Sequence, residues 1–509
     1  MTVLFDAPKT LEEVKSNTEQ QIAPYAEALA RHAAADPIQV MVPGHSGSGK
    51  DMSARLSNFL GERAVNLDLP LMLTGIDLGD DSPLMLAQKL AAEAWGAKRT
   101  WFMTNGASQA NRTAAVAARG IGERVLIQRS SHSSFGDGVL FTGLIPRFIK
   151  PSIDEHHGIA HGLTPSAVAA ALQQAVEEDR PVSSVYIVSP SYFGSVSDVA
   201  RIADVAHRYD AALIVDGAWG AHFGFHEDLP ESPLRLGADL AISSTHKLAG
   251  SLTQSAMLHL GYGPYADRLE DLIRRGINMT SSTSASALLM ASLDVSRQAL
   301  VAETDLIGES VENARMFRAL IKSDDRFSLI DETFANYRDI VGNDLLRIAI
   351  DVSKLGQSGH WVRDRLIEDH RVFFEMATAT TIVAVFGAGQ LPPIDKIFAA
   401  MQAVADEALS LEAATIVFPK LPEPGDLRTL PRDAFFGETE VVDAVEAVGR
   451  ISADSLAAYP PGIPNLLPGE EITEETVAFL QAVANSPTGY VRGAVDSKLT
   501  QFRVRRMYG

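Results

Sequence analysis

The stretch Ser244-Thr245-His246-Lys247 decides the fold of this chain, together with the apolar run Ala212-Leu213-Ile214-Val215-Asp216 about thirty residues before it. The earlier run has the length and the β-branched composition of a buried strand, and it ends in an acid. Taken alone, Asp216 reads as a turn residue and Lys247 as a surface lysine. The pair, in this order, indicates a functional site.

The chemistry of the two side chains suggests which ligand the site takes. A lysine amine can condense with an aldehyde and hold it as a Schiff base. An aspartate at the end of a buried strand can keep a pyridine nitrogen protonated, which makes the ring an electron sink. We therefore predict that pyridoxal 5'-phosphate (PLP) is the cofactor, with Lys247 as its anchor and Asp216 as the partner of its ring nitrogen.

Two upstream segments complete the predicted site. A short strand at 101–104 runs into Asn105-Gly106-Ala107-Ser108, and a helix is expected from Ala110 to Ala118. Gly106 permits a tight turn, Ser108 supplies a hydroxyl, and the N–H groups of a helix start attract an anion, so this segment predicts a phosphate cradle. A second strand, Val125 to Gln128, places His132 on the loop that follows, where it can stack on the cofactor ring.

Five segments then make the chain resemble the Orn/Lys/Arg decarboxylase family, the PLP-dependent basic amino acid decarboxylases. These segments follow the order of the family and span nearly the whole chain: Val42-Pro43-Gly44-His45, Thr104-Asn105-Gly106-Ala107-Ser108, Val215-Asp216-Gly217-Ala218-Trp219-Gly220-Ala221-His222, Ser244-Thr245-His246-Lys247 and Ala458-Tyr459-Pro460-Pro461-Gly462-Ile463-Pro464. The resemblance implies decarboxylation of lysine, ornithine or arginine to the corresponding amine and carbon dioxide, in polyamine biosynthesis.

The resemblance also assigns roles to residues at matched positions. Lys247, Asp216, His132 and His246 are the expected catalytic residues, with His246 assisting proton transfer. The expected cofactor-binding residues are Lys247, Asp216, His132, Gly106, Ala107, Ser108, Ser244, Ala218, Ser282 and Thr283. Of these, Ser282 and Thr283 lie in the segment that reaches the phosphate bound to the partner subunit in the family.

Four positions depart from the family pattern. Gly217 replaces a glutamate, Ser133 replaces a lysine or arginine, and Ala285 and Ala287 stand where proline and an aromatic residue are frequent. Two alternatives to decarboxylation therefore stay open. One is another PLP reaction, either aminotransfer or an oxygen-dependent decarboxylative oxidation, and the other is a catalytically silent regulator.

The predicted fold class is α/β, the PLP-dependent transferase fold of type I, because helical patterns alternate with short apolar strands from about 82 to 260. We expect a large domain with a mainly parallel seven-stranded sheet, a smaller α+β domain and a C-terminal α+β domain. The boundaries are an N-terminal helical arm at 1–40, a PLP-binding domain at 41–300, a small domain at 301–418 and a C-terminal domain at 419–509. A proline-rich linker, 418–425, precedes the last domain.

Composition excludes several classes of function. With no cysteine, the chain has neither disulfides nor thiolate metal sites. A net charge of −20 without a basic run argues against a nucleic-acid partner. No apolar run approaches the roughly 20 residues of a spanning helix, and no secretory signal is apparent at the start, so we expect a cytoplasmic protein without a membrane partner.

The segment Gly44-His45-Ser46-Gly47-Ser48-Gly49-Lys50 has the spacing of a nucleotide-binding P-loop. Asp51, however, replaces the serine or threonine that holds magnesium, and its carboxylate would crowd the phosphates. The family resemblance accounts for the segment better.

The segment Asp154-Glu155-His156-His157, with His161, is rich in potential metal ligands. Its glycines predict a loop, on which the four-residue spacing of His157 and His161 no longer gives a shared face. We therefore expect no metal site.

The family forms homodimers with active sites at the subunit interface, and only about forty residues precede Pro43 here, so we expect a homodimer, or a modest multiple of one, without the N-terminal wing domain of larger relatives. The acid that binds the distal cation of a small amino acid substrate is not identified by sequence. The candidates are Glu375, Asp433, Glu438 and Glu440.

Overall fold

The computed structural model describes residues 8–413, 421–459, 463–485 and 490–506. The chain forms two compact units. The first contains residues 1–114, 212–310 and 387–390, and the second contains residues 115–211, 311–386 and 391–509. Two long helices, α6 (Gly106–Ile121) and α13 (Thr304–Lys322), contribute to both units. The four domains predicted from sequence remain predictions.

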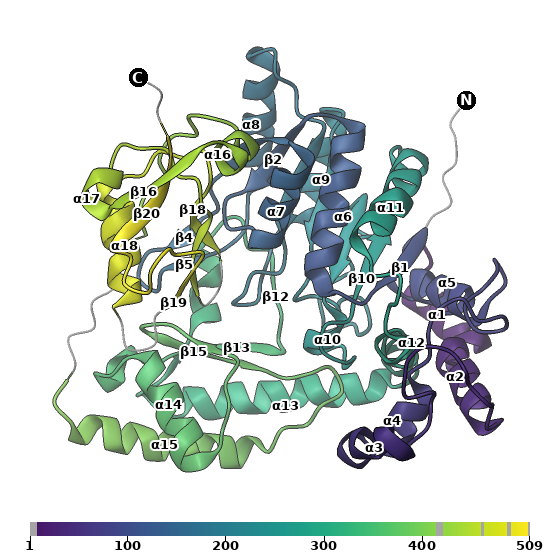
Figure 1. Cartoon of the computed structure of the whole chain (residues 1–509). Coiled ribbons are helices and arrows are strands. Elements are labelled where there is room, and N and C mark those ends of the chain that lie inside the picture. Colours follow the sequence, from purple (N-terminus) through teal and green to yellow (C-terminus); the bar gives the residue numbers. More distant parts are fainter. Residues whose placement is uncertain (1–7, 414–420, 460–462, 486–489, 507–509) are drawn as a thin grey trace. The chain divides into compact units, whose positions relative to one another are not determined.

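A seven-stranded sheet with the order β1-β10-β9-β8-β6-β2-β3 organises the fold, as predicted (Figure 1). Its strands are β1 (Arg99–Met103), β2 (Arg124–Gln128), β3 (Ile145–Ile149), β6 (Ser184–Val188), β8 (Ala212–Asp216), β9 (Leu240–Ser243) and β10 (Ala256–Leu260). Strand β10 runs antiparallel to β1 and β9, whereas β8 with β9, β2 with β3 and β2 with β6 are parallel pairs. The sheet is therefore mainly parallel.

The residues of the central strands explain this arrangement. All residues of β6, β8, β9 and β10 are buried, as expected of strands covered on both faces. Helix α5 (Pro83–Trp95), which Ser82 caps, leads into β1, and α9 (Val199–Arg208), which Asp198 caps, lies between β6 and β8. Both helices were expected from their apolar spacing, so the alternating pattern is confirmed.

The N-terminal arm of the first unit is broken rather than continuous. It consists of α1 (Leu11–Ser16), the 3-10 helix η1 (Thr18–Gln21) and α2 (Pro24–Ala34). The break has a physical cause, because Pro24 fits the first turn of a helix but disfavours helical backbone in the residue before it.

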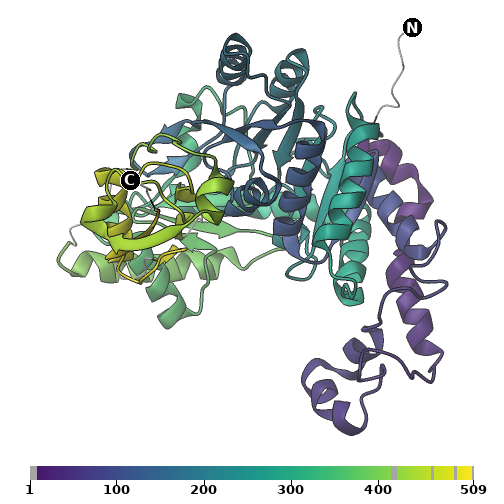
Figure 2. The same cartoon turned by 45° about the horizontal axis from the view of Figure 1, so that its top comes forward.

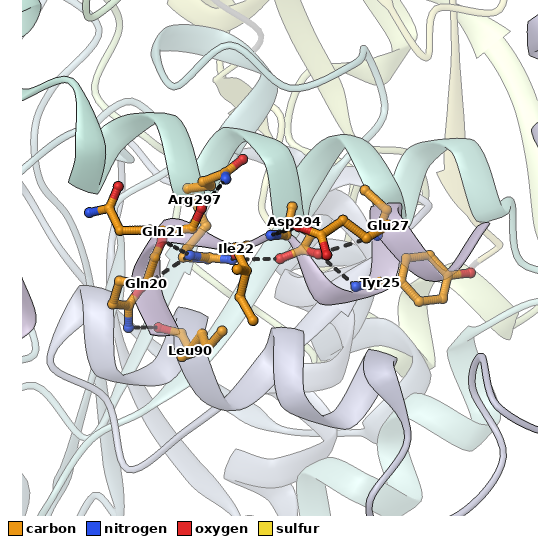
Figure 3. Close-up of polar contacts among 11 residues, drawn as sticks. Gln20, Gln21, Ile22, Tyr25, Glu27, Leu90, Asp294 and Arg297 are labelled. Carbon is orange, nitrogen blue, oxygen red and sulfur yellow. Dashed lines mark hydrogen bonds and ion pairs between the residues drawn. The ribbon is translucent and has the colours of Figure 1, made fainter. Parts of the chain in front are cut away.

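A buried ion pair on α12 (Ala287–Ala302) fixes this arm (Figure 3). Arg297 and Asp294 are fully buried and 2.8 Å apart. Arg297 donates to the carbonyls of Gln20 and Ile22, and Asp294 accepts from the N–H of Tyr25. Burial raises the pKa of Asp294 against the opposing effect of Arg297. The pair therefore satisfies the backbone groups exposed at the break.

The apolar positions of the run Ile38 to Val42 favour a strand, and this expectation is wrong. These residues form no strand, and Ile38, Val40 and Val42 are exposed, because no strand among the described residues pairs with them. The chain continues through turns to η2 (Asp51–Ser53), α3 (Ala54–Leu60) and α4 (Glu62–Leu67), the purple segment that projects in Figure 2. Among the described residues, no strand leads into Lys50, so the segment lacks the strand–loop–helix context of a nucleotide-binding P-loop.

The first unit is completed by α10 (Thr245–Leu248), α11 (Ala266–Thr280) and α12. Contacts of α12 with α2 and α5 join the arm to the sheet's covering helices.

The second unit adds elements around β2, β3 and β6. These elements are α7 (Ser133–Thr142), β4 (Ile153–Asp154), β5 (Ile159–Ala160), α8 (Pro165–Glu177) and β7 (Ser195–Val196), which pairs with β12 (Gly342–Asn343). An antiparallel sheet of order β11-β13-β15-β14 lies in the same unit. Its strands and helices are β11 (Ser328–Leu329), η3 (Ile330–Asn336), β13 (Arg347–Asp351), η4 (Ser353–Leu355), α14 (Gly359–His370), β14 (Met376–Ala377), β15 (Thr381–Val385) and α15 (Ile394–Ser410).

The C-terminal segment of the second unit has two small sheets around one apolar cluster. Its elements are α16 (Pro431–Phe436), β16 (Thr439–Asp443), α17 (Ala444–Ala447), β17 (Leu456–Tyr459), β18 (Pro464–Leu466), α18 (Glu474–Ala484), β19 (Tyr490–Arg492) and β20 (Gln501–Arg505). Leu456, Ile472, Leu480 and Phe502 are buried in the cluster. Residues 418–420 of the predicted linker and Pro460-Pro461-Gly462 of the last family motif lie outside the described residues.

Among the helices of the described ranges, none combines the length and the apolar character needed to cross a bilayer.

Candidate active site

Asp216 lies at the carboxyl end of β8, where it is 4% exposed. Its Oδ2 accepts a hydrogen bond of 3.1 Å from Nδ2 of Asn111 on α6, and its Oδ1 accepts one of 3.1 Å from the N–H of Ala218. A carboxylate that accepts a hydrogen bond on each oxygen is held in one orientation. The end of the strand therefore presents an oriented carboxylate.

Lys247 follows β9, the strand that pairs with the Asp216 end of β8. The parallel register places Asp216 beside Ile242 of β9, and β9 ends at Ser243, just before the buried Ser244 and helix α10. Lys247 is half-buried on α10, and its Nζ lies 3.7 Å from the centroid of the Trp219 ring. An ammonium over an indole face is stabilised by the ring's negative potential, so Trp219 positions the amine.

His246 is half-buried beside Lys247. Burial, and then the positive charge of Lys247, lower the pKa of His246 below its ordinary value. The imidazole is therefore neutral at neutral pH, and it can accept a proton on one nitrogen while it donates from the other.

The predicted phosphate cradle follows β1, which runs parallel to β9 because both are antiparallel to β10. Gly106 has a φ of +71°, and its N–H donates 2.7 Å to the carbonyl of Gln254. Gln254 in turn donates 3.0 Å from Nε2 to Oδ1 of Asn105. Ala107 and Ser108 then fall in the first turn of α6, where backbone N–H groups have no partner within the helix. This edge of the first unit therefore carries the cradle, Asp216 and Lys247 at the carboxyl ends of β1, β8 and β9.

Ser282 and Thr283 lie on the loop after α11 and are exposed. The loop is tied to α6 because Gln109 Nε2 donates 2.5 Å to Oγ of Ser281. Exposure is compatible with the expected reach toward a partner subunit, and that role stays a prediction.

His132 belongs to the second unit, where it caps α7. Its Nδ1 accepts from the N–H of Ser134 at 3.2 Å, which fixes the ring. The imidazole lines a pocket together with Arg129, Ser131, Asp137 and Phe148. Its predicted stacking on the cofactor remains untested.

The loop that carries His132 is held by a buried ion pair within the second unit. Arg129 Nη2 lies 3.0 Å from Glu470 Oε2, and Arg129 Nη1 donates to the carbonyl of Pro464 at 2.5 Å. Burial raises the pKa of Glu470, and Arg129 opposes that rise. Arg129 thus ties the loop after β2 to the C-terminal segment, three residues before His132.

The four candidate acids for a distal cation all lie in the second unit. Glu440 is paired with Arg450 at 2.6 Å and Glu438 with Arg506 at 3.7 Å, so both already face cations. Glu375 and Asp433 are exposed. The assignment of an acid to the substrate stays open.

Sequence reasoning missed Asn111 and the role of Trp219. Asn111 follows Ala107 by four residues, which puts it on the same face of α6 as the cradle, and this spacing was the available signal. The contact between Trp219 and Lys247 joins residues 28 positions apart, and no periodicity reveals it.

Comparison with known protein families gives two matches. Residues 23–339 match the major domain of the Orn/Lys/Arg decarboxylases, and residues 424–489 match the C-terminal domain of the same proteins.

Comparison with individual proteins agrees. The chain is 34% identical to an arginine decarboxylase of Bacillus subtilis, with 95% of this chain and 98% of the relative covered. It is 25% identical to a lysine decarboxylase of Pseudomonas aeruginosa, with 94% and 78% covered. The solved lysine decarboxylase of Francisella novicida has the same fold, with a TM-score of 0.80 at 18% identity over 96% of this chain and 82% of the other.

Proposed function

This chain belongs to the Orn/Lys/Arg decarboxylase family and is an amino acid decarboxylase, and on that premise we propose that its substrate is L-arginine. The sequence identities support this choice. The chain is 34% identical to a relative described as an arginine decarboxylase and 25% identical to one described as a lysine decarboxylase. The observation that carries the activity is the fixed carboxylate of Asp216 on the same sheet edge as Lys247.

We propose that PLP binds at this edge. The side chains at this edge fit the cofactor. The half-buried amine of Lys247 matches its aldehyde, and the oriented carboxylate of Asp216 matches its ring nitrogen. The start of α6, with Gly106 at positive φ, matches its phosphate. Gly106, Ala107, Ser108 and Ser244 are the proposed phosphate contacts. When bound, PLP supplies an electron sink for the pair left on the α-carbon as the carboxylate departs as carbon dioxide.

With PLP bound, each of these residues would have a separate role. Asp216 keeps the ring nitrogen protonated, and Asn111 and the N–H of Ala218 keep Asp216 in place. Lys247 Nζ would anchor the cofactor, and its amine could also carry the proton that the α-carbon takes up. His246, neutral at the working pH, assists this transfer. His132 would stack on the ring, and Ala218 would lie against it.

We further propose that the enzyme acts as a cytoplasmic homodimer in which Ser282 and Thr283 reach the partner's phosphate. Support comes from the first unit, where the segment 38–60 exposes large apolar side chains. Ile38, Val40, Met52 and Phe59 are at least 85% exposed. Apolar groups gathered in this way are characteristic of surfaces that another protein covers. Sedimentation at micromolar concentration should show twice the chain mass, and a Phe59→Asp variant should shift the protein toward monomer.

Kinetics with separate substrates test the proposed specificity. PLP-loaded protein should decarboxylate arginine with a kcat/KM about 100-fold above that for lysine or ornithine, because a site shaped for a guanidinium leaves donors and acceptors unpaired with a shorter cation. A preference for lysine or ornithine would retain the family chemistry and refute the substrate.

Reduction with borohydride followed by peptide mapping tests the anchor. The cofactor should be found on the peptide that contains Lys247, and Lys247→Ala should carry none and have no turnover. Cofactor attached to another lysine, or turnover by Lys247→Ala near the wild-type rate, would refute the assignment.

A further inference from the structure

A cluster of potential metal ligands lies in the second unit, among residues with no part in the proposed chemistry. His156 and His157 occupy the turn between β4 and β5, and Asp351 is the last residue of β13. One ligand atom from each of the three side chains falls within 4.8 Å of the other two. Two imidazoles and one carboxylate therefore converge from segments almost two hundred residues apart.

The buried histidine of the cluster is already oriented. His157 is 5% exposed, and its Nδ1 lies 3.0 Å from Oγ1 of Thr380, so the outward ring nitrogen is Nε2. Metal-binding histidines are commonly oriented in this way, by a hydrogen bond on the nitrogen that does not coordinate.

Hydrogen bonds also fix the turn that carries the two histidines and the carboxylate of Asp351. Oδ1 of the buried Asp154 accepts from the N–H groups of His156 and His157 at 2.9 and 3.1 Å, which sets the turn. Asp351 accepts 2.8 Å from the N–H of Ser353, and Ser328 Oγ lies 3.3 Å from its other oxygen. The carboxylate therefore has a defined direction.

An apolar cluster beneath the site keeps the two segments together. Ile159 of β5 is buried in one cluster with Ala349 of β13 and Val383 of β15. The hairpin cannot drift from the strand that carries Asp351 without opening this core, so the convergence belongs to the fold of the unit and does not depend on flexible side chains alone.

We propose that His156, His157 and Asp351 bind a divalent transition-metal ion, of which Zn²⁺ is the best match. Zn²⁺ takes imidazole nitrogen and carboxylate oxygen at about 2.0–2.2 Å, which places neighbouring ligand atoms about 3.3–3.5 Å apart. The ring of His156 is exposed and packs edge-on against that of His157, with centroids 4.5 Å apart, so a small movement of this exposed side chain would close the present spacing. A water molecule would complete the four ligands.

The sequence predicted no metal site in this segment, because His157 and His161 do not share a face on a loop. His161, four residues after His157, is not among the three converging side chains. Its ring contacts Phe334 and Tyr337, and its Nδ1 lies 3.2 Å from Oγ of Ser195. The acid that completes the cluster comes instead from the antiparallel sheet. The bound ion would fasten the hairpin to that sheet and so raise the thermal stability of the second unit.

Calorimetric titration of the chelator-treated holoenzyme with Zn²⁺ tests the site. Wild-type protein should bind one ion per chain at these residues and should gain several degrees in Tm with the ion present. The affinity should fall at least 10-fold in His156→Ala and in Asp351→Asn, which keeps the shape of the side chain. His370→Ala, which removes an exposed histidine at the end of α14, is the matched control and should bind like wild type.

Substitution of Co²⁺ for Zn²⁺ gives an independent reading, because its visible absorption reports ligand number and type. The spectrum should indicate nitrogen and oxygen ligands in wild type and should change in both variants. Decarboxylation should stay near the wild-type rate in both, which separates this site from the proposed active site. Zn²⁺ affinity that is equal in wild type, His156→Ala and Asp351→Asn, or no saturable Zn²⁺ binding by the wild-type protein, would overturn the proposal.

Discussion

Asn111 Nδ2 lies 3.1 Å from Oδ2 of Asp216, and this hydrogen bond joins the helix of the phosphate cradle to the end of the strand that carries the acid. Both side chains are buried, at 1% and 4% exposure. The cradle and the acid are thereby held as one rigid group, and a cofactor bound to both meets them at a fixed separation. Asn111 is therefore a positioning residue.

Asn111→Ala should lower kcat/KM about 10- to 100-fold, because a hydrogen bond to a charged group contributes about 1.5–3 kcal/mol. The loss should appear mainly in kcat at saturating PLP. Asp216→Asn should lose more, since the pyridine nitrogen then has no negative partner. Steady-state kinetics with Asn485→Ala, an exposed asparagine on the last helix turn, provide the control. Asn111→Ala with unchanged kcat would show that Asp216 does not depend on it.

Trp219 should support activity because the face of its ring contacts Lys247 Nζ. Trp219→Phe keeps an aromatic face beneath Lys247 Nζ and should retain much of the activity, whereas Trp219→Leu should lose about 5-fold, in line with about 1 kcal/mol for a cation–π contact. The rate at which apoprotein recovers its PLP absorption band measures the positioning directly. Equal rates for the two variants would show that the contact is incidental.

The lowered pKa of His246 predicts how activity depends on pH on the acid side of the pH–rate profile. Because its pKa is lowered, the neutral imidazole persists below the ordinary value of 6.5, and activity should fall only when the pH drops below that value. His246→Asn should flatten this limb and lower kcat. A wild-type profile that is already declining above pH 7 on the acid side would contradict the role.

The same shift predicts a change in stability. The unfolded chain takes up the proton of His246 near pH 6.5, and the folded chain takes it up only at lower pH. As the pH falls through that window the unfolded state binds more protons, so the free energy of unfolding decreases. Denaturant titrations from pH 7 to pH 5 should show a smaller decrease for His246→Asn than for wild type.

Removing either partner of the Arg129–Glu470 ion pair should lower the free energy of unfolding. Glu470→Ala or Arg129→Met leaves one buried charge without its partner, and each should destabilise the protein by about 3–5 kcal/mol. The double variant should recover part of that loss in a thermodynamic cycle measured by denaturant. Losses that simply add would show that the two charges do not stabilise each other. Because the loop continues to His132, both single variants should also lower kcat.

The fold was predictable because the deciding residues are local. Asp216 ends an apolar strand and Gly106 begins a helix, and each of these signals lies within a few positions of the element that it marks. The strand expected at Ile38 to Val42 was wrong because strand formation depends on a neighbour that the run of apolar residues does not specify.

The parts of the site that escaped prediction are contacts between distant segments. Asn111 meets Asp216 across more than a hundred residues, and Asp351 meets His157 across nearly two hundred. Sequence spacing gave no reason to pair His157 with His161 on a loop, and the acid that approaches His157 comes from another sheet. Contacts of this kind follow from the packing of the elements and have no periodic signal.

Release of carbon dioxide from arginine labelled in its carboxylate is the measurement that tests the central claim most directly. PLP-loaded protein under nitrogen should release labelled carbon dioxide and the corresponding amine in equal amounts, and Lys247→Ala should release neither. A keto acid product, a requirement for oxygen, or no labelled carbon dioxide from any basic amino acid would contradict the account.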